Sequence, residues 1–359
     1  MVILTDKDLS QTVFFKNGRY NVLTDKIEPP TSKIFITSTL PYNFDPRAKC
    51  PIWRWFVNDV FNSDEESIAL LQEWFGYNMI FSNHMEQMIF LFGVPGSGKS
   101  TTIDVLRAML GPDRCCAINV ETFTNQFGLA PMVGKYAAII SESQAVQRTH
   151  AQKVLEKIKQ ITGQDIVSIR RLYKEAFDAK LFCKITYVGN ELPRFDDEPG
   201  ALFRRFNLLY YANNYFKSPR IPDRTLKTKL LQELPGIALW ALDGLQRLLT
   251  NGDFTRPSVS TEHIDDCKRL ASPLQTMLTD WCELKPGAFV PVNDVYDLHR
   301  AIYQEAGIQP MNRIWFGRKM KDACSEVYKH DRKVNGVRCV VYEGMQINQE
   351  AYRIFLGRP

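Results

Sequence analysis

The sequence predicts an α/β protein with a parallel sheet at its centre. Between about residues 87 and 211, apolar strand-like runs alternate with helical stretches, and such alternation favours parallel strands joined by helices. The first of these runs leads into a glycine-rich turn, GVPGSGKS at 93–100, and a helix-like stretch follows the turn. We expect short strands and helices before this centre, and three helices with a small β-ribbon after it.

The N-terminal region combines short strands with helices. Residues 1–50 are rich in β-branched and turn-forming residues, and the run FFKNGRYNVLTDKIEPP predicts two short strands around Asn17-Gly18. A helix is expected over Trp53–Phe61. The sequence Ser63-Asp64-Glu65-Glu66 then has the pattern of a capping box that opens an amphipathic helix over Ile68–Tyr77.

Five apolar runs are the candidate strands of the central sheet. They are Met88–Phe92, Cys116–Val120, Ala137–Ser141, Lys184–Gly189 and Asn207–Tyr211.

The turn at 93–100 has the spacing of a phosphate-binding P-loop, the Walker A motif, between a strand and a helix as that motif requires. Glycines let backbone N–H groups turn inward around an anion, and the helix N-terminus adds partial positive charge. We expect Lys99 to reach the β- and γ-phosphates and the Ser100 hydroxyl to ligate Mg²⁺, so the predicted cofactors are ATP and Mg²⁺. The nucleotide-binding candidates are Gly93, Pro95, Gly96, Ser97, Gly98, Lys99, Ser100 and Thr101.

Two further strand ends carry candidates for catalysis. Glu142 directly follows the run Ala137–Ser141 and is expected to bind the metal and to activate the attacking water. The usual pattern has two adjacent acids, and Ser141 occupies the place of the first, so one carboxylate would do both jobs. Asn190 follows the next strand, where its amide could hold the water in line with the γ-phosphate; a simple turn residue is the alternative.

Paired arginines, Arg204 and Arg205, follow the acidic loop Asp196-Asp197-Glu198. An arginine supplied by a neighbouring subunit can stabilise the charge that develops on a γ-phosphate, so both residues are candidates for that role. A solvated surface pair is the alternative interpretation.

The last third of the chain is mostly helical by its periodicity. Residues 223–250 predict a helical segment that ends at Asn251-Gly252. Beyond it, three more helices and a hairpin around Glu343-Gly344 give the plan of a winged helix. The expected helices are Pro273–Leu284, Val292–Ala306 and Arg313–Tyr328, and the expected hairpin strands are Arg338–Tyr342 and Gln346–Asn348.

Composition sets further limits. A chain of 359 residues has room for two or three domains. We divide it into a β and helical region at 1–85, the P-loop sheet at 86–215, a helical segment at 216–270 and a winged-helix-like domain at 271–359. The eight cysteines and five histidines lack metal-ligand spacing, which favours free thiols. No run approaches the ~18 apolar residues of a membrane span, and a signal-peptide pattern is absent, so we expect a cytoplasmic protein without membrane partners.

Positive charge is concentrated near the C-terminus. From Lys285 onward there are 12 Lys and Arg residues against 8 Asp and Glu residues, within a formal net charge of +5 for the whole chain. Basic residues lie on the third expected helix of this region and in the approach to its hairpin. Winged helices contact duplex phosphates with these elements, but they also serve as protein-docking modules, and the small excess favours neither use.

At these motifs the chain resembles the superfamily 3 helicases, most closely the phage and plasmid primase type shared with large DNA viruses. The resemblance lies in SES at 141–143, in LEKIKQITGQDIVSIRRLYKEAFDAKLFCKITYVGNELPRF at 155–195 and in ALFRRF at 201–206. Segments before and after these motifs are also similar to the family, so the resemblance spans nearly the whole chain.

The resemblance implies an AAA+-like motor with a helical collar before it. It further implies a homo-hexameric ring that translocates on single-stranded DNA at a replication fork, with a primase or primase-polymerase module in the same or a partner chain. In this family a β-hairpin projects into the ring channel, and its matching residues here are Arg170, Arg171, Tyr173 and Lys174. A basic residue at a hairpin tip can bind phosphate, and an aromatic one can stack on a base.

Two other function classes stay open at this point. An ATP-dependent DNA-binding initiator or loading scaffold with little unwinding activity is favoured by the missing acid at Ser141. A P-loop kinase for a small molecule is disfavoured, since neither the arginine pair nor the winged helix would have a role in it.

Overall fold

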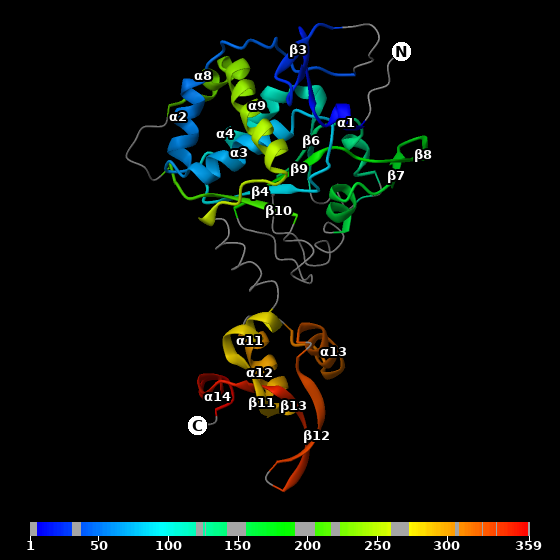
Figure 1. The fold of residues 1–359 in the computed structure, drawn as a ribbon, viewed down its shortest axis with the longest axis vertical. Helices are drawn as coiled ribbons and strands as arrows, with labels where there is room; N and C mark the ends of the chain where they lie inside the picture. Colours follow the sequence, from blue (N-terminus) through cyan, green and yellow to red (C-terminus); the bar gives the residue numbers. More distant parts are fainter. Residues whose placement is uncertain are drawn as a thin grey trace. The chain divides into compact units, whose positions relative to one another are not determined.

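The five apolar runs form one sheet in the computed structural model, and every pair of neighbouring strands is parallel (Figure 1). Its strand order is β10-β4-β9-β6-β5. The strands are β4 (Met88–Gly93), β5 (Cys115–Ile118), β6 (Ala137–Ser141), β9 (Lys184–Val188) and β10 (Phe206–Tyr211). The predicted parallel α/β centre is therefore confirmed, with strand ends that differ by one or two residues.

The chain divides into two compact units, Met1–Asp265 and Asp266–Pro359, and each is considered by itself. The structure describes residues 6–30, 37–119, 125, 127–141, 156–190, 205–216, 223–259, 273–305, 309–324, 326–334 and 336–357.

The central sheet is buried on both faces, as parallel sheets require. Side chains alternate across a strand, so β4 contributes Ile89 and Leu91 to one hydrophobic core and Met88, Phe90 and Phe92 to a second core. All six residues of β4 are buried. This burial on both faces explains why the strands have continuous apolar runs rather than alternating patterns in the sequence.

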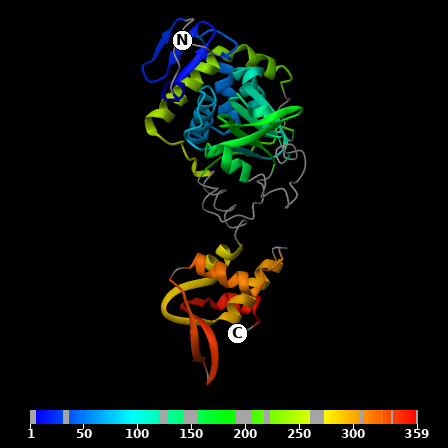
Figure 2. The same ribbon diagram turned by 90° about the vertical axis from the view of Figure 1, so that its right-hand side faces the viewer.

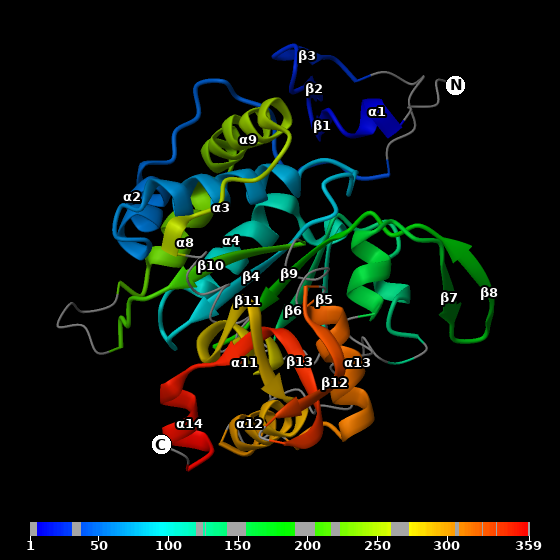
Figure 3. The same ribbon diagram turned by 60° about the horizontal axis from the view of Figure 1, so that its bottom comes forward.

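Among the described residues of the first unit, five helices contribute to the first core, and Figure 3 shows α3, α4 and α9 together on one face of the sheet. They are α2 (Pro51–Val60), α3 (Glu65–Tyr77), α4 (Lys99–Leu110), α8 (Leu226–Gln232) and α9 (Leu234–Asn251). The second core contains residues of the helical segment 156–162 and of a two-stranded sheet, β7 (Val167–Arg171) and β8 (Lys174–Ala179). Short 3-10 turns, η1 (Pro112–Arg114) and η2 (Ala130–Met132), complete the connections.

Helices α3 and α9 approach each other closely because glycines line their contact. A Cβ atom on Gly76 would lie 2.3 Å from the carbonyl oxygen of Ala241, and one on Gly244 would lie 2.5 Å from the carbonyl group of Gln72. Any side chain at either position would therefore push the two backbones apart. Helix α9, which follows the sheet in the sequence, is thus packed directly against α3, which precedes the sheet.

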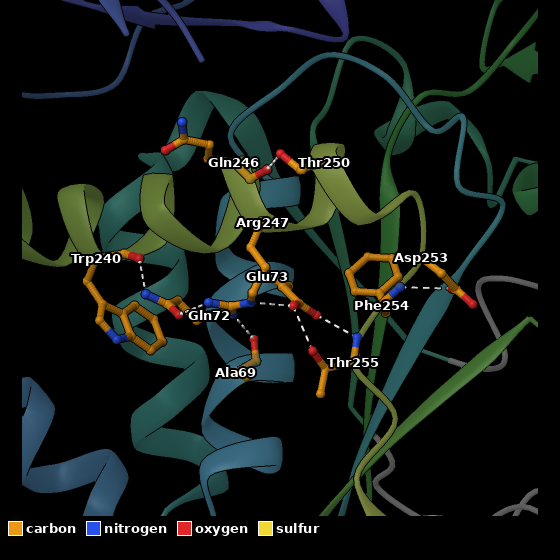
Figure 4. Close-up of polar contacts among 10 residues, drawn as sticks. All are labelled: Ala69, Gln72, Glu73, Trp240, Gln246, Arg247, Thr250, Asp253, Phe254 and Thr255. Carbon is orange, nitrogen blue, oxygen red and sulfur yellow. Dashed lines mark hydrogen bonds and ion pairs between the residues drawn. The ribbon is translucent and has the colours of Figure 1, made fainter. Parts of the chain in front are cut away.

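An ion pair with a buried carboxylate adds to this contact (Figure 4). Glu73 is fully buried, and its Oε1 accepts hydrogen bonds from Arg247 Nε at 2.7 Å and from the Thr255 hydroxyl at 2.8 Å. Its Oε2 accepts from the Thr255 backbone N–H at 2.8 Å. Arg247 also donates to Gln72 Oε1 and to the Ala69 carbonyl, both at 2.9 Å. Because a buried charge is costly without such partners, this network holds α3, α9 and the chain beyond α9 in one arrangement.

The N-terminal strands form a sheet of their own, which lies beside α9 (Figure 2). A short helix, α1 (Asp6–Leu9), precedes β1 (Thr12–Phe15), β2 (Gly18–Asn21) and β3 (Lys26–Glu28). The two predicted strands around Asn17-Gly18 are confirmed, and β3 is an additional strand that the sequence did not reveal. Its three residues are all exposed, so β3 has no apolar periodicity.

The predicted capping box before α3 is wrong in detail. Asp64 is the N-cap residue, and its side chain accepts a hydrogen bond from the Glu66 N–H at 3.2 Å. Ser63 has a positive φ of 62° and lies outside the helix. The Glu66 carboxylate accepts instead from the backbone and hydroxyl of Ser258, a partner 192 residues away in sequence. A tertiary contact therefore replaces the expected local one.

The second unit contains helices and a three-stranded antiparallel sheet in the order β11-β13-β12. Its elements are α11 (Pro273–Trp281), β11 (Cys282–Pro291), α12 (Val292–Glu305), α13 (Arg313–Ala323), β12 (Tyr328–Val334), β13 (Val337–Ile347) and α14 (Gln349–Phe355). The three predicted helices exist, but the first ends at Trp281 and the third at Ala323, and a strand begins soon after each.

The predicted position of the C-terminal hairpin is wrong. The turn lies between Val334 and Val337 rather than at Glu343-Gly344, and Gly336 has the positive φ of 83° that a tight turn accommodates. Gly344 lies inside β13 with a φ of 94°, opposite an irregularity in the pairing with β11. A glycine at a strand irregularity resembles a turn signal in the sequence, which explains the misplacement.

The core of the second unit encloses a histidine. His299 is fully buried against the rings of Tyr296, Tyr303 and Phe316, and neither ring nitrogen has a hydrogen-bond partner among the described residues. Burial lowers the pKa of His299 from 6.5 to about 4. The folded unit therefore contains a neutral imidazole at neutral pH.

Within the described ranges, no helix combines the length and the apolar character needed to cross a membrane. The same ranges contain no group of three or more His, Cys, Asp or Glu side chains placed to hold a metal ion. Seven cysteines in this part of the chain are free thiols, as the sequence predicted for them.

The Gly244→Ala substitution should lower the free energy of unfolding by about 1–3 kcal/mol, because its methyl group overlaps the Gln72 carbonyl. Chemical denaturation measures this loss. Gly317→Ala is the matched control, since a Cβ at this position in α13 meets nothing within 4 Å. It should stabilise its helix by up to about 1 kcal/mol. Equal effects of the two substitutions would contradict the proposed close packing.

As the pH is lowered, the melting temperature of the wild type should fall more steeply than that of the His299→Leu variant. The unfolded chain binds a proton at His299 below about pH 6.5, whereas the folded chain does so only near pH 4. The contribution of neutral His299 to the free energy of unfolding is therefore fully present above pH 6.5. It is lost as the pH falls toward 4, by about 3 kcal/mol in total. Melting curves of both proteins across this range give the difference, and parallel pH profiles would contradict the assignment.

Candidate functional site

The candidate site lies at the carboxyl edge of the parallel sheet. The register places Leu91 of β4, Val188 of β9 and Ser141 of β6 at one level. The ends of these three strands therefore lie side by side at the edge where ligands of α/β proteins bind. Since β9 lies between the other two strands, the end of β6 is about 10 Å from β4.

The loop after β4 has the backbone geometry of an anion-binding turn. Gly93, Gly96 and Gly98 have positive φ angles of 135°, 72° and 98°, which residues other than glycine rarely adopt. At Gly93 a side chain is also excluded by space, because a Cβ would lie 2.2 Å from the Tyr211 carbonyl oxygen. Helix α4 begins at Lys99, directly after this turn. Its N-terminus therefore faces the concave side of the loop.

Lys99 is folded into the loop that carries it. Its Nζ donates hydrogen bonds to the carbonyl oxygens of Gly93 at 2.7 Å and Val94 at 2.8 Å, and to the Ser97 hydroxyl at 3.2 Å. Only 7% of Lys99 is exposed, and burial lowers the pKa of its ammonium group. Lys99 thus fills the loop and donates hydrogen bonds to the loop backbone. An anion bound in the turn would replace or supplement these bonds.

The remaining residues of the motif differ in exposure. Ser100 and Pro95 are exposed, and Thr101 is half-buried. Ser97 is buried and bonded to Lys99. The residue Ser100, in the first turn of α4, is therefore accessible from solvent, which a metal ligand requires.

Helix α2 and the segment after β10 support the loop from outside. A Cβ on Gly98 would lie 3.1 Å from Val60 and 3.3 Å from Phe56, so α2 contacts the loop directly. We call residues 212–216 the exit segment, because it leaves β10 and passes beside the loop. Its Tyr215 N–H donates to the Gly96 carbonyl at 3.1 Å, and the Tyr215 hydroxyl donates to Asp59 of α2 at 2.7 Å.

Sequence reasoning did not single out the exit segment. Asn213 donates from its side-chain amide to the Asp59 carbonyl at 2.8 Å and to Asn62 at 3.0 Å. The side chain of Phe216 is 79% exposed, and its ring contacts the Gly96 backbone. The one available signal was position, since these residues follow the last strand of the sheet at the edge where the site lies.

The catalytic candidates of the neighbouring strands emerge beside the loop. Asn190 is exposed and follows β9, next to Gly189, whose N–H donates to the Leu91 carbonyl at 3.1 Å. Ser141 is the exposed last residue of β6. Glu142 lies outside the described residues. The strand order thus puts Asn190 between the P-loop and the end of β6.

Arg205 is bonded within its own chain. Its Nη1 donates to the Lys159 carbonyl at 2.9 Å and to the Thr162 hydroxyl at 3.3 Å, and its Nη2 lies 3.4 Å from Glu86 Oε2. These bonds place its cation at the C-terminal end of the helical residues 156–162, where positive charge is favourable. This intramolecular role differs from the one expected for a residue that acts on a neighbouring nucleotide. Arg204 lies outside the described residues.

The predicted hairpin between the acid and the asparagine exists as β7 and β8. Arg171 pairs with Lys174 across a two-residue turn, in which Tyr173 has a positive φ of 56° and is 96% exposed. The guanidinium of Arg171 lies 4.7 Å from the centre of the Phe177 ring. Arg170, Arg171 and Lys174 are all exposed. The tip therefore presents an aromatic ring among basic side chains.

The residues at the sheet edge fit Mg²⁺-ATP. The three loop glycines and the N-terminus of α4 form a turn that accepts phosphate oxygens, and Lys99 supplies a cation. Ser100 offers an accessible oxygen to the metal. The geometry of the loop, rather than its sequence pattern alone, therefore supports a nucleotide site.

Comparisons with known proteins agree with this organisation. Residues 5–62 match a family described as D5 N terminal like, and residues 91–205 match a family of unknown function, DUF5906. The two matches fall on the region before the P-loop and on the sheet with its loop.

Solved structures of the NrS-1 C terminal region share the fold. One, an A-form apo structure, aligns at 14% identity over 93% of this chain and 83% of that chain, with a TM-score of 0.57. A second, of residues 305–718, aligns at 16% identity over 94% of this chain and 82% of that chain, with a TM-score of 0.55. The arrangement of elements is thus shared over most of both chains.

The Arg205→Ala substitution should lower the free energy of unfolding by about 1–2 kcal/mol, because it removes hydrogen bonds from a cation to the end of a helix. Urea denaturation measures the change. Arg224→Ala is the control, since Arg224 is an exposed arginine of the same unit. Unchanged stability in Arg205→Ala would show that these bonds contribute little.

Proposed function

We propose that this chain is an ATP-driven replicative DNA helicase of a phage, plasmid or virus, which forms a hexameric ring and translocates on single-stranded DNA. The observation that carries the proposal is the sheet edge, where a P-loop with a buried lysine lies beside an exposed asparagine and the strand end that precedes Glu142. A hairpin with an exposed aromatic tip belongs to the same unit. Nucleotide binding and DNA contact would thus be combined in one body.

In the proposed site, each residue has a distinct task. The loop backbone and Lys99 would bind the β- and γ-phosphates, and Ser100 with Glu142 would hold the metal. Glu142 would also accept a proton from the attacking water, which the Asn190 amide would orient. Mg²⁺, when bound, supplies Lewis-acid stabilisation of the phosphate charge. The AAA+-like assignment of the motor rests on β9 lying between the P-loop strand and the acid-bearing strand.

A further cation for the site would come from a neighbouring subunit. Arg205 is bonded to the end of the helical residues 156–162, so of the arginine pair we propose Arg204 as the residue that reaches the nucleotide of a neighbouring subunit. Such a cation stabilises the charge on the transferred phosphoryl group. A ring would therefore be required for full activity, since each nucleotide would lie between two subunits.

The hairpin is the proposed contact with single-stranded DNA. Its tip offers an almost fully exposed Tyr173 for base stacking, with Arg170, Arg171 and Lys174 nearby for the phosphates. Aromatic and basic groups together bind single strands with little sequence preference. This property suits a motor that moves along any sequence.

The second unit supports the proposal as a winged helix. Its described elements follow the order helix, strand, two helices, two strands and a final helix, and strands β12 and β13 would be the wing. Helix α13 exposes Arg313, Arg318 and Lys321 beside Trp315, and Arg318 lies 5.4 Å from the Trp315 ring. Basic residues on such a helix are suited to the duplex part of fork DNA.

The comparisons support the same assignment. The D5 N terminal like match covers the region that the resemblance to superfamily 3 helicases places before the motor. The fold shared with the NrS-1 C terminal region extends over both units of the chain. In the proposed setting a primase or primase-polymerase module acts with this motor, in the same or a partner chain, in the host cytoplasm.

One observation favours a second function, an ATP-dependent initiator or loading scaffold. Ser141, described at the end of β6, stands where P-loop ATPases commonly have a first acid. A single carboxylate at this edge would support slow turnover, which suffices for assembly on DNA but not for sustained unwinding.

We expect single-stranded DNA to stimulate ATP hydrolysis several-fold in the wild type. Lys174→Ala should keep basal hydrolysis and lose most of the stimulation, because the lysine contacts DNA and not nucleotide. Lys99→Ala should abolish hydrolysis with and without DNA. Phosphate release and unwinding of a forked duplex measure these activities, and light scattering with nucleotide and DNA measures the assembly.

The Arg204→Ala substitution distinguishes a nucleotide site shared between two subunits from a site formed by one chain alone. It should abolish hydrolysis while nucleotide binding stays within about twofold of the wild type, since the residue would act only on a neighbour's nucleotide. Hydrolysis that is unaffected by DNA and by Lys174→Ala would rule out the helicase and leave the initiator. A strict monomer under all conditions would rule out the ring helicase.

A further inference from the structure

Phe216 occupies an unusual place for a large apolar side chain. Its side chain is 79% exposed, and among the described residues the ring has no aromatic partner. Single exposed apolar side chains are common and need no explanation by themselves. Phe216 differs because its ring contacts a glycine of the P-loop: a Cβ on Gly96 would lie 2.3 Å from the ring.

The exit segment holds this ring in position. The backbone of Tyr215 is bonded to Gly96, and its hydroxyl is bonded to Asp59 of α2. Asn213 is bonded to the carbonyl oxygens of Asp59 and Val60, and the Phe216 N–H donates to Asn214 Oδ1 at 3.1 Å. The backbone beside the ring is thus fixed by several hydrogen bonds, although most of the ring faces solvent.

The strand order tells which end of a nucleotide would lie near Phe216. The residues proposed to act on the γ-phosphate follow β9 and β6, which lie on one side of β4. The exit segment follows β10, which lies on the other side of β4. A triphosphate bound along the loop with its γ-phosphate toward β9 must therefore direct its nucleoside toward β10. Phe216 lies at that end.

We propose that Phe216 stacks on the nucleobase of the nucleotide bound at the P-loop. The inference rests on the proposed nucleotide site and adds its base-binding side. An aromatic face stacks on any base, because every base has a π face. The contact would thus raise affinity for ATP and GTP alike and would contribute nothing to the binding of the phosphates alone.

The test is calorimetric titration of the full chain with Mg²⁺ and three ligands: non-hydrolysable analogues of ATP and GTP, and inorganic tripolyphosphate. Phe216→Ala should raise the Kd of both nucleotide analogues by about tenfold, the loss expected for one base–aromatic stack. The Kd of tripolyphosphate should not change. Phe216→Trp should retain the affinity for the analogues, and Phe216→Leu should lose most of it.

Leu23→Ala serves as the distant control, since Leu23 is an exposed apolar residue of the N-terminal sheet region and should not affect any ligand. Equal weakening of nucleotide and tripolyphosphate in Phe216→Ala would overturn the inference, because the ring would then support the loop. Unchanged binding of all three ligands would overturn it as well. A wild type that binds none of them would instead refute the nucleotide site itself.

Discussion

The parallel register of β4, β9 and β6 is the constraint on which the candidate site depends. Three segments far apart in the sequence reach the same edge because their strands run in one direction and are level at Leu91, Val188 and Ser141. The strands hold this register because both faces of the sheet are buried, so a slip of one residue would turn core side chains to the wrong face.

Contacts around the P-loop connect it to regions before and after the sheet. Helix α2 contacts Gly98, and the exit segment bonds to both Gly96 and α2. The close packing of α3 on α9 and the buried Glu73 then join the preceding and following helices to each other. The loop is therefore in contact with elements that precede the sheet in the sequence and with elements that follow it.

Residues of the same type differ in burial and in bonding partners. Lys99 is buried with a lowered pKa in the loop, whereas Lys174 is exposed at the hairpin tip. Arg205 is bonded to a helix end in its own subunit, although its sequence neighbour Arg204 shares the motif. Residue type alone does not distinguish these roles, because burial and bonding partners decide what a cation can reach.

The sequence by itself determined the central α/β fold and the glycine-rich turn at 93–100, from its apolar runs and glycine spacing. The β7–β8 hairpin was expected from the family resemblance of its residues rather than from a local pattern. Only the tertiary structure decided the bonding of Arg205, the N-cap at Asp64, the position of the C-terminal turn and the place of Phe216. Each of these depends on a partner distant in sequence or on a backbone angle, such as Gly344 inside a strand, that a local pattern does not encode. The physical reason is that local propensity fixes the elements, whereas packing between elements fixes what each side chain contacts.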